Sequence, residues 1–448
     1  MPIEEVDTVV VGAGQAGLAM SEHLSAAGIA HVVLERHRIA ERWRTARWDS
    51  LVANGPAWHD RFPGMEFPGH RDSFPSKEVV ADYFVSYAEM IAAPVRCGVD
   101  VTSVCRLEGR AGFRVETSVG TFEANNVVAA TGPFQIPLIP DVIPKDARVT
   151  QIHSNEYRNP AQLPDGGVLV VGAGSSGGQI ADELLRAGRA VYLSVGPHER
   201  PPRSYRGYDF CWWLGVLGKW DIETKTRGTE HVTISVSGAR GGYTVDFRRL
   251  AEEGMMLVGS TKSYSDSKVT FANDLRENVA MGDQSLISLL DEADDYVKRT
   301  GLELPEEPEA RIIPPDPECL TDPLRELDFR AAGVNTVIWA TGYSSDYSWL
   351  KVDAFDPAGK PRHQRGISRE PGIFFLGLPW QSRRGSAFIW GVWHDAKYLA
   401  DRISTQRRYR DYHNERAGEI DRGKAAAAPR TSNPAIAEYC GIENKRKS

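Results

Sequence analysis

Two glycine-rich runs in this sequence have the residue types and spacing that bind the phosphates of a dinucleotide. Each follows a stretch of mostly β-branched apolar residues, at 8–11 and 168–171, and the glycines are Gly12, Gly14 and Gly17 in the first copy and Gly172, Gly174 and Gly177 in the second. Glycine permits a tight turn and a close approach of the backbone to a pyrophosphate, and a helix that starts there offers free N–H groups to the anion. We therefore predict two phosphate-binding turns, the alternative being that the glycines serve only a strand–helix turn.

The residues between these glycines are expected to line the same phosphate sites. They are Gln15 and Ala16 in the first copy and Ser175 and Ser176 in the second. The two serine hydroxyls could donate to a pyrophosphate, and the alternative role for them is to cap the helix that follows.

The two copies differ at the residue that would meet the ribose of a dinucleotide. Glu35 ends the strand after the first copy, and a carboxylate there accepts hydrogen bonds from both ribose hydroxyls, which suits FAD or NAD. Arg36, beside it, is assigned to the same site. The equivalent position in the second copy is Ser194, which is followed by the basic residues Arg200 and Arg203. A missing carboxylate with cations nearby suits the 2′-phosphate of NADP, whereas a solvated surface loop is the alternative.

The elements that must position these residues are two β-α-β units. Helical patterns run over residues 18–27 and 179–187, and each stops at a glycine. A second apolar strand follows each helix, at 31–35 and 190–194. We therefore predict an α/β fold with two dinucleotide-binding, Rossmann-like domains.

Two further buried strands, predicted near residues 126–130 and 335–339, end in the same tripeptide. It comprises Ala130, Thr131 and Gly132 in the first case and Ala340, Thr341 and Gly342 in the second. A glycine at a strand end lets the backbone lie close to a cofactor or to another strand. We assign all six residues to cofactor binding.

Composition excludes several classes of function. The 448 residues carry 53 Lys+Arg against 60 Asp+Glu, a net charge of −7, which gives no electrostatic reason to expect nucleic acid. No apolar run approaches the ~20 residues of a membrane span, and no signal peptide is visible, so we expect a cytoplasmic protein. The five cysteines form no C-x-x-C pair and no metal-ligand cluster, so we expect buried free thiols and no metal site.

The chain resembles the class B flavin-containing monooxygenases over residues 6–405. The resemblance is carried by the two dinucleotide units, by Trp-Ala-Thr-Gly-Tyr at 339–343, and by Ser-Leu-Val-Ala-Asn-Gly-Pro at 50–56. The family's identifying sequence, F-x-G-x-x-x-H-x-x-x-Y/F, is half present. His153 and Tyr157 fit it, and Ala147 stands in place of the Phe. Tyr157 also stands where Baeyer–Villiger enzymes of the group carry Trp, which argues against that chemistry.

The resemblance implies a domain plan in which the NADP-binding domain is inserted in the FAD-binding domain. The FAD-binding domain would comprise residues 1–143 and 331–412. The NADP-binding domain, with an inserted helical region, would comprise 144–330. Residues 413–448 form an Ala-rich, charged tail whose composition predicts disorder.

The resemblance also implies the activity and the cofactors, FAD and NADPH. The family forms a flavin C4a-hydroperoxide from dioxygen and inserts one oxygen atom into a small organic substrate. N- or S-oxygenation or hydroxylation fits this chain best. Family members are often dimers, which makes a homodimer a natural expectation.

Several residues take roles from the resemblance alone. Asn54 is the candidate catalytic residue, placed beside the flavin, with a simple Asn-Gly-Pro turn as its alternative. Trp43 and Val101 are assigned to FAD binding. An aromatic-rich stretch is assigned to the substrate, with plain core packing as the alternative, and its members are Trp380, Gln381, Phe388, Trp390, Trp393 and His394.

Other functions remain open on the same sequence. An NADPH oxidase or a flavin-linked reductase would use the same two dinucleotide folds, and a Baeyer–Villiger monooxygenase or a non-enzymatic flavoprotein is a further alternative. A disulfide reductase would need a redox-active cysteine pair, and the sequence holds no C-x-x-C motif.

Overall fold

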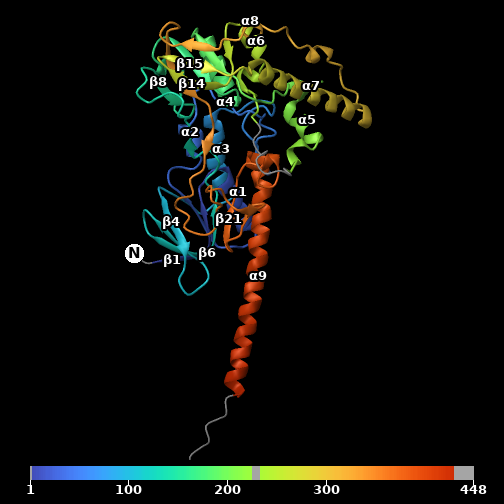
Figure 1. Cartoon of the computed structure of the whole chain (residues 1–448). Helices are drawn as coiled ribbons and strands as arrows, with labels where there is room; N and C mark the ends of the chain where they lie inside the picture. The colour runs from blue at the N-terminus through green and yellow to red at the C-terminus, as the bar shows by residue number, and fades with distance from the viewer. Residues whose placement is uncertain (1–2, 224–232, 428–448) are drawn as a thin grey trace, which may run out of the picture. The chain divides into compact units, whose positions relative to one another are not determined.

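The computed structural model describes residues 3–223 and 233–427 (Figure 1). The chain divides into two compact units. The first unit, Met1–Ala400, contains both of the large sheets. The second unit, Asp401–Ser448, contains the later part of helix α9 (Ile389–Ala427), which begins in the first.

The first sheet is built around the buried strand β1. Its described strands follow the order β19–β20–β21–β6–β1–β2–β3, with β5 paired to β6 and β4 paired to β5. They are β1 (Glu4–Val11), β2 (His31–Glu35), β3 (Val95–Cys97), β4 (Val101–Arg106), β5 (Phe113–Thr117), β6 (Thr121–Ala129), β19 (His363–Gln364), β20 (Ile367–Ser368) and β21 (Ile373–Phe375). The five strands from β21 to β3 run parallel. Parallel strands are covered on both faces, which explains why the end of β1 is a continuous run of valine.

Helix α1 (Gln15–Ala26) packs beside this sheet, and α3 (Lys77–Met90) packs against α1. Gly14 is the N-cap of α1, so the helix starts three residues before the predicted position 18 and includes part of the glycine run. Gly28, with φ +64°, ends it in the left-handed conformation that glycine adopts without strain. The short α2 (Glu41–Thr45) follows β2 and contacts α3.

The second sheet repeats the arrangement of the first. Its described strands are all parallel and follow the order β13–β10–β9–β17–β8. They are β8 (Thr150–His153), β9 (Gly167–Val171), β10 (Val191–Ser194), β13 (Met256–Val258) and β17 (Val334–Trp339), and helix α4 (Ser175–Arg186) follows β9. Because residues 150–339 lie between the two parts of the first sheet, the predicted α/β fold with one dinucleotide-binding domain inserted in the other is confirmed.

Strand β17 lies in the second sheet, although the predicted domain boundary at residue 331 would place it with the first sheet. β17 was expected in the FAD-binding part, but its register with β9 and β8 places it in the second sheet. It is the counterpart of β6, since each lies beside the strand that precedes a glycine turn, and each is followed by Ala-Thr-Gly. The internal repeat therefore extends further than the β-α-β units.

Smaller elements complete the first unit. The remaining strands are β7 (Ile136–Pro137) with β18 (Tyr343–Ser344), β11 (Ser204–Tyr205) with β12 (Tyr208–Asp209), and β14 (Thr261–Ser265) with β15 (Lys268–Phe271) and β16 (Glu326–Asp328). The remaining helices are α5 (Phe210–Val216), α6 (Phe247–Glu252), α7 (Leu275–Thr300) and α8 (Glu318–Thr321).

Helix α9 is longer than the sequence indicated. It begins at Ile389 and continues to Ala427, so the first part of the tail predicted to be disordered from 413 is helical. Residues 428–448, with Cys440, lie outside the described residues. Among those described, Cys211 and Cys319 are buried free thiols as expected, whereas Cys97 is exposed and Cys105 half-buried. No described helix is long and apolar enough to cross a membrane, and no metal-ligand cluster occurs in the same residues.

Candidate functional site

The first glycine turn lies directly against the end of β6. Gly12 has φ +105°, and a Cβ atom there would stand 2.8 Å from the Ala130 carbonyl oxygen, so only glycine fits. A Cβ at Gly17 would stand 1.8 Å from the Gly12 carbonyl oxygen. Two of the glycines are thus explained by packing within the turn.

Glu35 fixes the shape of this turn. Its Oε2 accepts a hydrogen bond from the Ala13 N–H at 2.8 Å, and its Oε1 accepts one from the His37 N–H at 2.9 Å. Each carboxylate oxygen has further acceptor capacity. The residue predicted to meet a ribose therefore also holds the phosphate-binding backbone in place.

A cavity of about 540 Å³ opens beside the turn. The residues predicted for FAD that line it are Gly12, Gly14, Gln15, Ala16, Glu35, Arg36, Trp43, Val101, Ala130, Thr131 and Gly132. Gly17 does not line it, because it packs behind the turn. Residues from β1, β2, α2, β4 and the end of β6 thus meet at one place, at the carboxyl ends of parallel strands where α/β sheets bind ligands.

Arg47 is a lining residue that the sequence reasoning missed. Its guanidinium donates to the Ala46 carbonyl oxygen at 3.0 Å and lies over the rings of Trp43 and Phe134, at 5.9 and 5.1 Å. Among the described residues it has no carboxylate partner, and burial lowers the pKa of Arg47. The signal available in the sequence was its position four residues after Trp43, just beyond α2.

Gln135 is a second missed residue of this cavity. Its Nε2 donates to Thr131 Oγ1 at 2.9 Å and to the Gly132 carbonyl oxygen at 2.8 Å, and its Oε1 accepts from the Asp346 N–H at 2.9 Å. It therefore ties the Ala-Thr-Gly segment after β6 to the chain that follows β18.

These residues fit a flavin dinucleotide. The wall combines a glycine turn at a helix N-terminus, a carboxylate at the adjacent strand end and an arginine with no carboxylate partner among the described residues. The turn suits a pyrophosphate, the carboxylate suits a ribose, and the arginine suits a phosphate oxygen.

The second glycine turn has the same internal geometry as the first. Gly172 has φ +115°, and a Cβ there would stand 2.5 Å from the Ala340 carbonyl oxygen. A Cβ at Gly177 would stand 1.8 Å from the Gly172 carbonyl oxygen. Ala340 therefore supports the second turn and does not line the FAD cavity.

The rest of the second Ala-Thr-Gly tripeptide also has structural partners. Thr341 Oγ1 donates to the Leu138 carbonyl oxygen, and the Gly342 carbonyl oxygen accepts from His153 Nε2 at 3.0 Å. This tripeptide thus lies close to other segments of the chain. The sequence had left this open as the alternative to contact with a cofactor.

Unlike the first turn, the second is covered by its own chain. Residues 233–238, which we call the cover segment, lie across it. Ser175 Oγ donates to the Ile234 carbonyl oxygen at 2.8 Å, and Ser235 Oγ donates to the Ala173 carbonyl oxygen. Ser175, predicted to bind a pyrophosphate, is thus engaged by the cover segment, and Ser176 is the next residue of the same helical turn.

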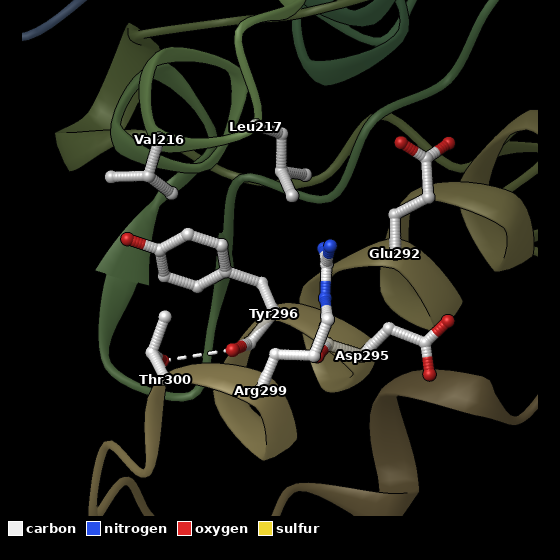
Figure 2. A pocket seen from close by; sticks show the side chains of 7 residues that line it. All are labelled: Val216, Leu217, Glu292, Asp295, Tyr296, Arg299 and Thr300. Atoms are coloured by element: carbon white, nitrogen blue, oxygen red, sulfur yellow. Dashed lines mark hydrogen bonds between the residues drawn. The ribbon is translucent and has the colours of Figure 1, made fainter.

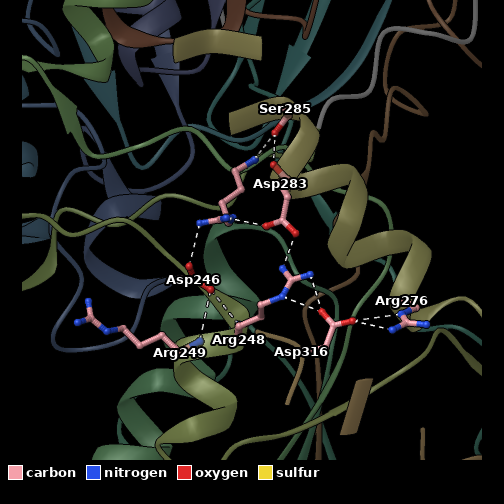
Figure 3. A network of polar contacts seen from close by, with 9 residues as sticks. Asp246, Arg248, Arg249, Arg276, Asp283, Ser285 and Asp316 are labelled. Carbon is pink, nitrogen blue, oxygen red and sulfur yellow. Dashed lines mark hydrogen bonds and ion pairs between the residues drawn. The ribbon is translucent and has the colours of Figure 1, made fainter. Parts of the chain in front are cut away.

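Three residues predicted for NADP are buried and have partners within the protein, and their predicted role at a 2′-phosphate stays a prediction. Ser194 is 2% exposed and donates to the Gly259 carbonyl oxygen at 2.9 Å. Arg200 is 3% exposed and pairs with Asp283 and Asp246, at 2.6 and 3.2 Å. Figure 3 shows the network around Asp283, which also includes Arg248 and Asp316.

Arg203 is equally committed within the protein. It pairs with Asp209 at 2.5 Å and lies between the rings of Phe74 and Phe210, with its guanidinium carbon 4.7 and 4.5 Å from their centroids. Its Nη1 donates to the Asn54 carbonyl oxygen at 2.7 Å. The residues present thus do not form an open NADP site in this conformation.

Asn54 lies outside the lining of the FAD cavity. Its side-chain Oδ1 accepts from Gln179 Nε2 at 2.9 Å, and Gln179 is a residue of α4. The Asn54 amide therefore joins the loop at 50–56 to the helix after the second glycine turn. Its predicted catalytic role stays a prediction.

A histidine–aspartate pair follows Asn54 in the same loop. His59 Nδ1 lies 2.7 Å from Asp60 Oδ1, while Asp60 Oδ2 accepts from the Gly55 N–H at 3.0 Å. The His59 ring is packed against Trp58, Trp220 and Trp390, at centroid distances of 5.2–5.5 Å. This pair was not singled out in the sequence.

The six residues predicted for the substrate do not form one group. Phe388 and Trp390 pack on Trp220, at 5.4 and 5.3 Å. Trp393 points elsewhere, since its Nε1 donates to Glu22 Oε2 of α1 at 2.5 Å. His394 is exposed, and its ring lies 5.3 Å from that of Trp393. Gln381 is buried and accepts from the Leu378 N–H, and Trp380 has φ +54°.

A second cavity of about 450 Å³ lies between α5 and α7 (Figure 2). It is lined by Val216, Leu217, Glu292, Asp295, Tyr296, Arg299 and Thr300. None of these residues was predicted to bind a ligand, and neither glycine turn borders the cavity.

Comparisons with known proteins identify relatives of this chain and a solved structure with a similar fold. Residues 9–208 match the family described as pyridine nucleotide-disulphide oxidoreductase. The chain is 36% identical over 403 residues to an uncharacterized oxidoreductase, CzcO-like, of Geobacillus kaustophilus, which covers 89% of this chain and 98% of the relative. It is 33% identical over 428 residues to the indole-3-pyruvate monooxygenase YUCCA1 of Oryza sativa, and the match covers 90% of this chain and 92% of that relative. A flavin-containing monooxygenase from Stenotrophomonas maltophilia has a similar fold, with a TM-score of 0.62 and 21% identity. The match covers 90% of this chain and 99% of that structure.

Proposed function

The chain belongs to the class B flavin-containing monooxygenases, and we propose that it inserts one oxygen atom from dioxygen into a small organic substrate at the expense of NADPH. Membership makes it an oxidoreductase with the expected cofactors, FAD and NADPH. The finer choice of N-oxygenation, S-oxygenation or hydroxylation is part of the proposal, with a nucleophilic nitrogen or sulfur as the first substrate class to try.

The observation that carries this proposal is the cavity beside the first glycine turn. Its lining brings the turn, Glu35, Trp43 and Arg47 together. Residues distant in sequence thus converge on one volume with the donor set of a flavin dinucleotide site, and the same cavity is where we place FAD.

Each wall of the cavity has a distinct task in this proposal. Bound FAD supplies the transfer of electrons from NADPH to dioxygen. Glu35 holds the phosphate-binding backbone through the Ala13 N–H, and Arg47 offers a positive charge with no competing carboxylate among the described residues. Gln135 holds Thr131 and Gly132, so that the backbone beside the cavity keeps its shape.

The proposal is tested by following the flavin spectrum through one turnover. The FAD-loaded protein would be reduced with NADPH without oxygen and then mixed with oxygenated buffer in a stopped-flow spectrometer. A monooxygenase is expected to show a transient absorbance band between those of reduced and oxidised flavin, lasting seconds or longer, and decaying faster with a true substrate. Amines, thioethers and an aryl 2-oxo acid would be screened, the last because of the relative from Oryza sativa.

The opposite outcome has a defined meaning. Direct return to oxidised flavin with stoichiometric hydrogen peroxide, with every substrate in the panel, would replace the proposal by an NADPH oxidase. The expected homodimer and cytoplasmic location stay predictions, and sedimentation of the purified protein would test the first.

A further inference from the structure

We propose that the cover segment, residues 233–238, closes the second dinucleotide site and must leave the glycine turn before NADPH can bind. The inference rests on the proposed function, because it assumes that NADPH uses the second glycine turn. The sequence contains the complete glycine motif for this cofactor, at Gly172, Gly174 and Gly177, but in the structure the cover segment is in direct contact with that turn.

The contacts of the cover segment occupy the position of a phosphate. Ile234 and Ser235 bond to Ser175 and Ala173, the residues on either side of Gly174, and Thr233 lies over Gly174 itself. A Cβ built on Gly174 would stand 3.1 Å from Thr233 Cγ2. Because these groups are in direct contact with the turn, a pyrophosphate cannot lie between them.

The first glycine turn serves as an internal comparison. A Cβ built on Gly14, the equivalent of Gly174, meets nothing within 4 Å, and Gly14 lines the large cavity. The two turns have the same backbone geometry at Gly12 and Gly172. The difference between an open and a closed site is therefore due to the cover segment and not to the motif.

The cover segment is anchored on three sides. It forms a bridge with Glu199, whose N–H donates to the Thr233 carbonyl oxygen at 2.7 Å and whose carbonyl oxygen accepts from the Ser235 N–H at 2.9 Å. Gln179 of α4 donates to the Val236 carbonyl oxygen at 2.6 Å. The third anchor is Arg203, which donates to the Ser237 carbonyl oxygen at 3.2 Å. Each bond contributes only modestly in net terms, so the closed state can be displaced by a tightly binding anion.

The same anchors reach the candidate catalytic loop. Gln179 and Arg203 each bond both to the cover segment and to Asn54. A Cβ on Gly238 would stand 2.1 Å from the Ala53 carbonyl oxygen, which shows how closely the segment approaches this loop. Displacing the segment would thus remove one partner each from Gln179 and Arg203, the two side chains that hold Asn54.

Hydrogen exchange on the FAD-loaded protein tests the inference in the intact enzyme. Binding of NADP⁺ is measured in parallel by equilibrium dialysis. If the segment is displaced, saturating NADP⁺ speeds exchange at the amides of Ser235 and Glu199, because their bridge is broken. If NADP⁺ binds and these amides exchange at the same rate or more slowly, the inference is overturned, while the proposed function stands.

A variant gives a second, independent readout. Ser235→Ala removes the hydroxyl that bonds the Ala173 carbonyl oxygen and so weakens the closed state alone. Since a ligand's apparent affinity falls with the fraction of closed protein, this change should lower the Kd for NADP⁺ about three- to tenfold. Ser263→Ala, at an exposed serine in β14 that bonds Thr270, is the matched control and should leave the Kd unchanged.

The remaining outcomes are also decisive. An unchanged or raised Kd in Ser235→Ala would overturn the inference. Binding of NADP⁺ by the variant and not by the natural protein would support it strongly. Absence of binding in both would instead refute the dependence on NADPH, and the inference would fall with the proposed function. If the variant does not fold, exchange on the natural protein decides alone.

Discussion

At the scale of single residues, the two charged groups Glu35 and Arg47 at the FAD cavity differ in the partners that they have within the protein. Glu35 accepts hydrogen bonds from two backbone N–H groups, so its carboxylate stabilises the shape of the turn as well as facing any ligand. Arg47 has no such internal partner among the described carboxylates, and it faces the cavity between Trp43 and Phe134. Burial of an arginine is unfavourable unless hydrogen bonds or an anion compensate its charge, and Arg47 bonds to the Tyr343 side chain and lines a cavity that can hold an anion.

We therefore predict that Arg47→Met weakens FAD binding. Methionine keeps the apolar stem and removes the charge, so the Kd for FAD should rise about ten- to a hundredfold, as expected when a charge-assisted hydrogen bond to a phosphate is lost. The Kd would be measured by fluorescence quenching on reconstitution of the apoprotein.

Arg38→Met is the matched control for this change. Arg38 lies just before α2 whereas Arg47 lies just after it, and Arg38 is paired with Glu41 at 2.7 Å and does not line the cavity. Equal losses in the two variants would show that Arg47 has no specific role toward FAD.

At the scale of elements, helix α7 is attached to the second sheet region by a cluster of buried charges. Asp283 of α7 accepts from Arg200 and from Arg248 of α6, and Asp316 accepts from Arg248 and Arg276 (Figure 3). Arg200 and Arg248 are 3% and 6% exposed. The cluster therefore joins α6, α7 and the chain after β10, and it depends on every charge having its partner.

Removing one carboxylate from this cluster should destabilise the protein markedly. Asp283→Asn leaves two buried guanidinium groups short of a partner, and the free energy of unfolding should fall by about 3 kcal/mol. Glu326→Gln, which breaks the exposed pair between Lys268 and Glu326, should cost under about 1 kcal/mol. Urea unfolding followed by tryptophan fluorescence compares the two, and similar losses would contradict the role of the cluster.

At the scale of the whole molecule, one architecture is used twice with different outcomes. Both sheets place a glycine turn beside an Ala-Thr-Gly strand end, at Gly12 against Ala130 and at Gly172 against Ala340. The first turn opens on a cavity, and the second is closed by residues 233–238. The repeat thus supplies two equivalent glycine turns, and the segment packed over each turn determines whether a ligand can reach it.

The stability of the whole molecule should depend on pH through its buried histidines. His153 is fully buried, its Nε2 lies 3.0 Å from the Gly342 carbonyl oxygen, and its Nδ1 lies 3.0 Å from Asn155 Oδ1 and 3.2 Å from the Asn155 backbone nitrogen. Burial lowers the pKa of His153 and of His198. Because the unfolded chain binds protons near pH 6.5 and the folded chain does not, stability is present above that pH and is lost below it.

We therefore expect the free energy of unfolding to fall between pH 7 and pH 5, by up to about 1.4 kcal/mol per pH unit for each such histidine. Urea unfolding at several pH values measures the slope. His153→Gln should flatten it, whereas His70→Asn, at an exposed position, should not. A stability that stays constant down to pH 5 would show that these rings gain their protons without unfolding.

The sequence by itself determined the features that depend on neighbours along the chain. The glycine turns, the carboxylate at Glu35 and the first Ala-Thr-Gly were predictable, because a strand, a turn and a helix start within a few residues impose those types. These residues do line the cavity that we assign to FAD, with Gly17 packed behind it.

Only the tertiary structure decided what surrounds the second turn. Arg200 and Arg203 had the spacing of a phosphate site, yet both are buried and each is paired with a carboxylate. For Arg200 that carboxylate is Asp283, 83 residues away, which the local sequence does not indicate. β17 joined the second sheet because its register with β9 is a long-range pairing. The cover segment reaches Ser175 from 59 residues downstream, and whether it covers the turn depends on how the intervening chain folds back.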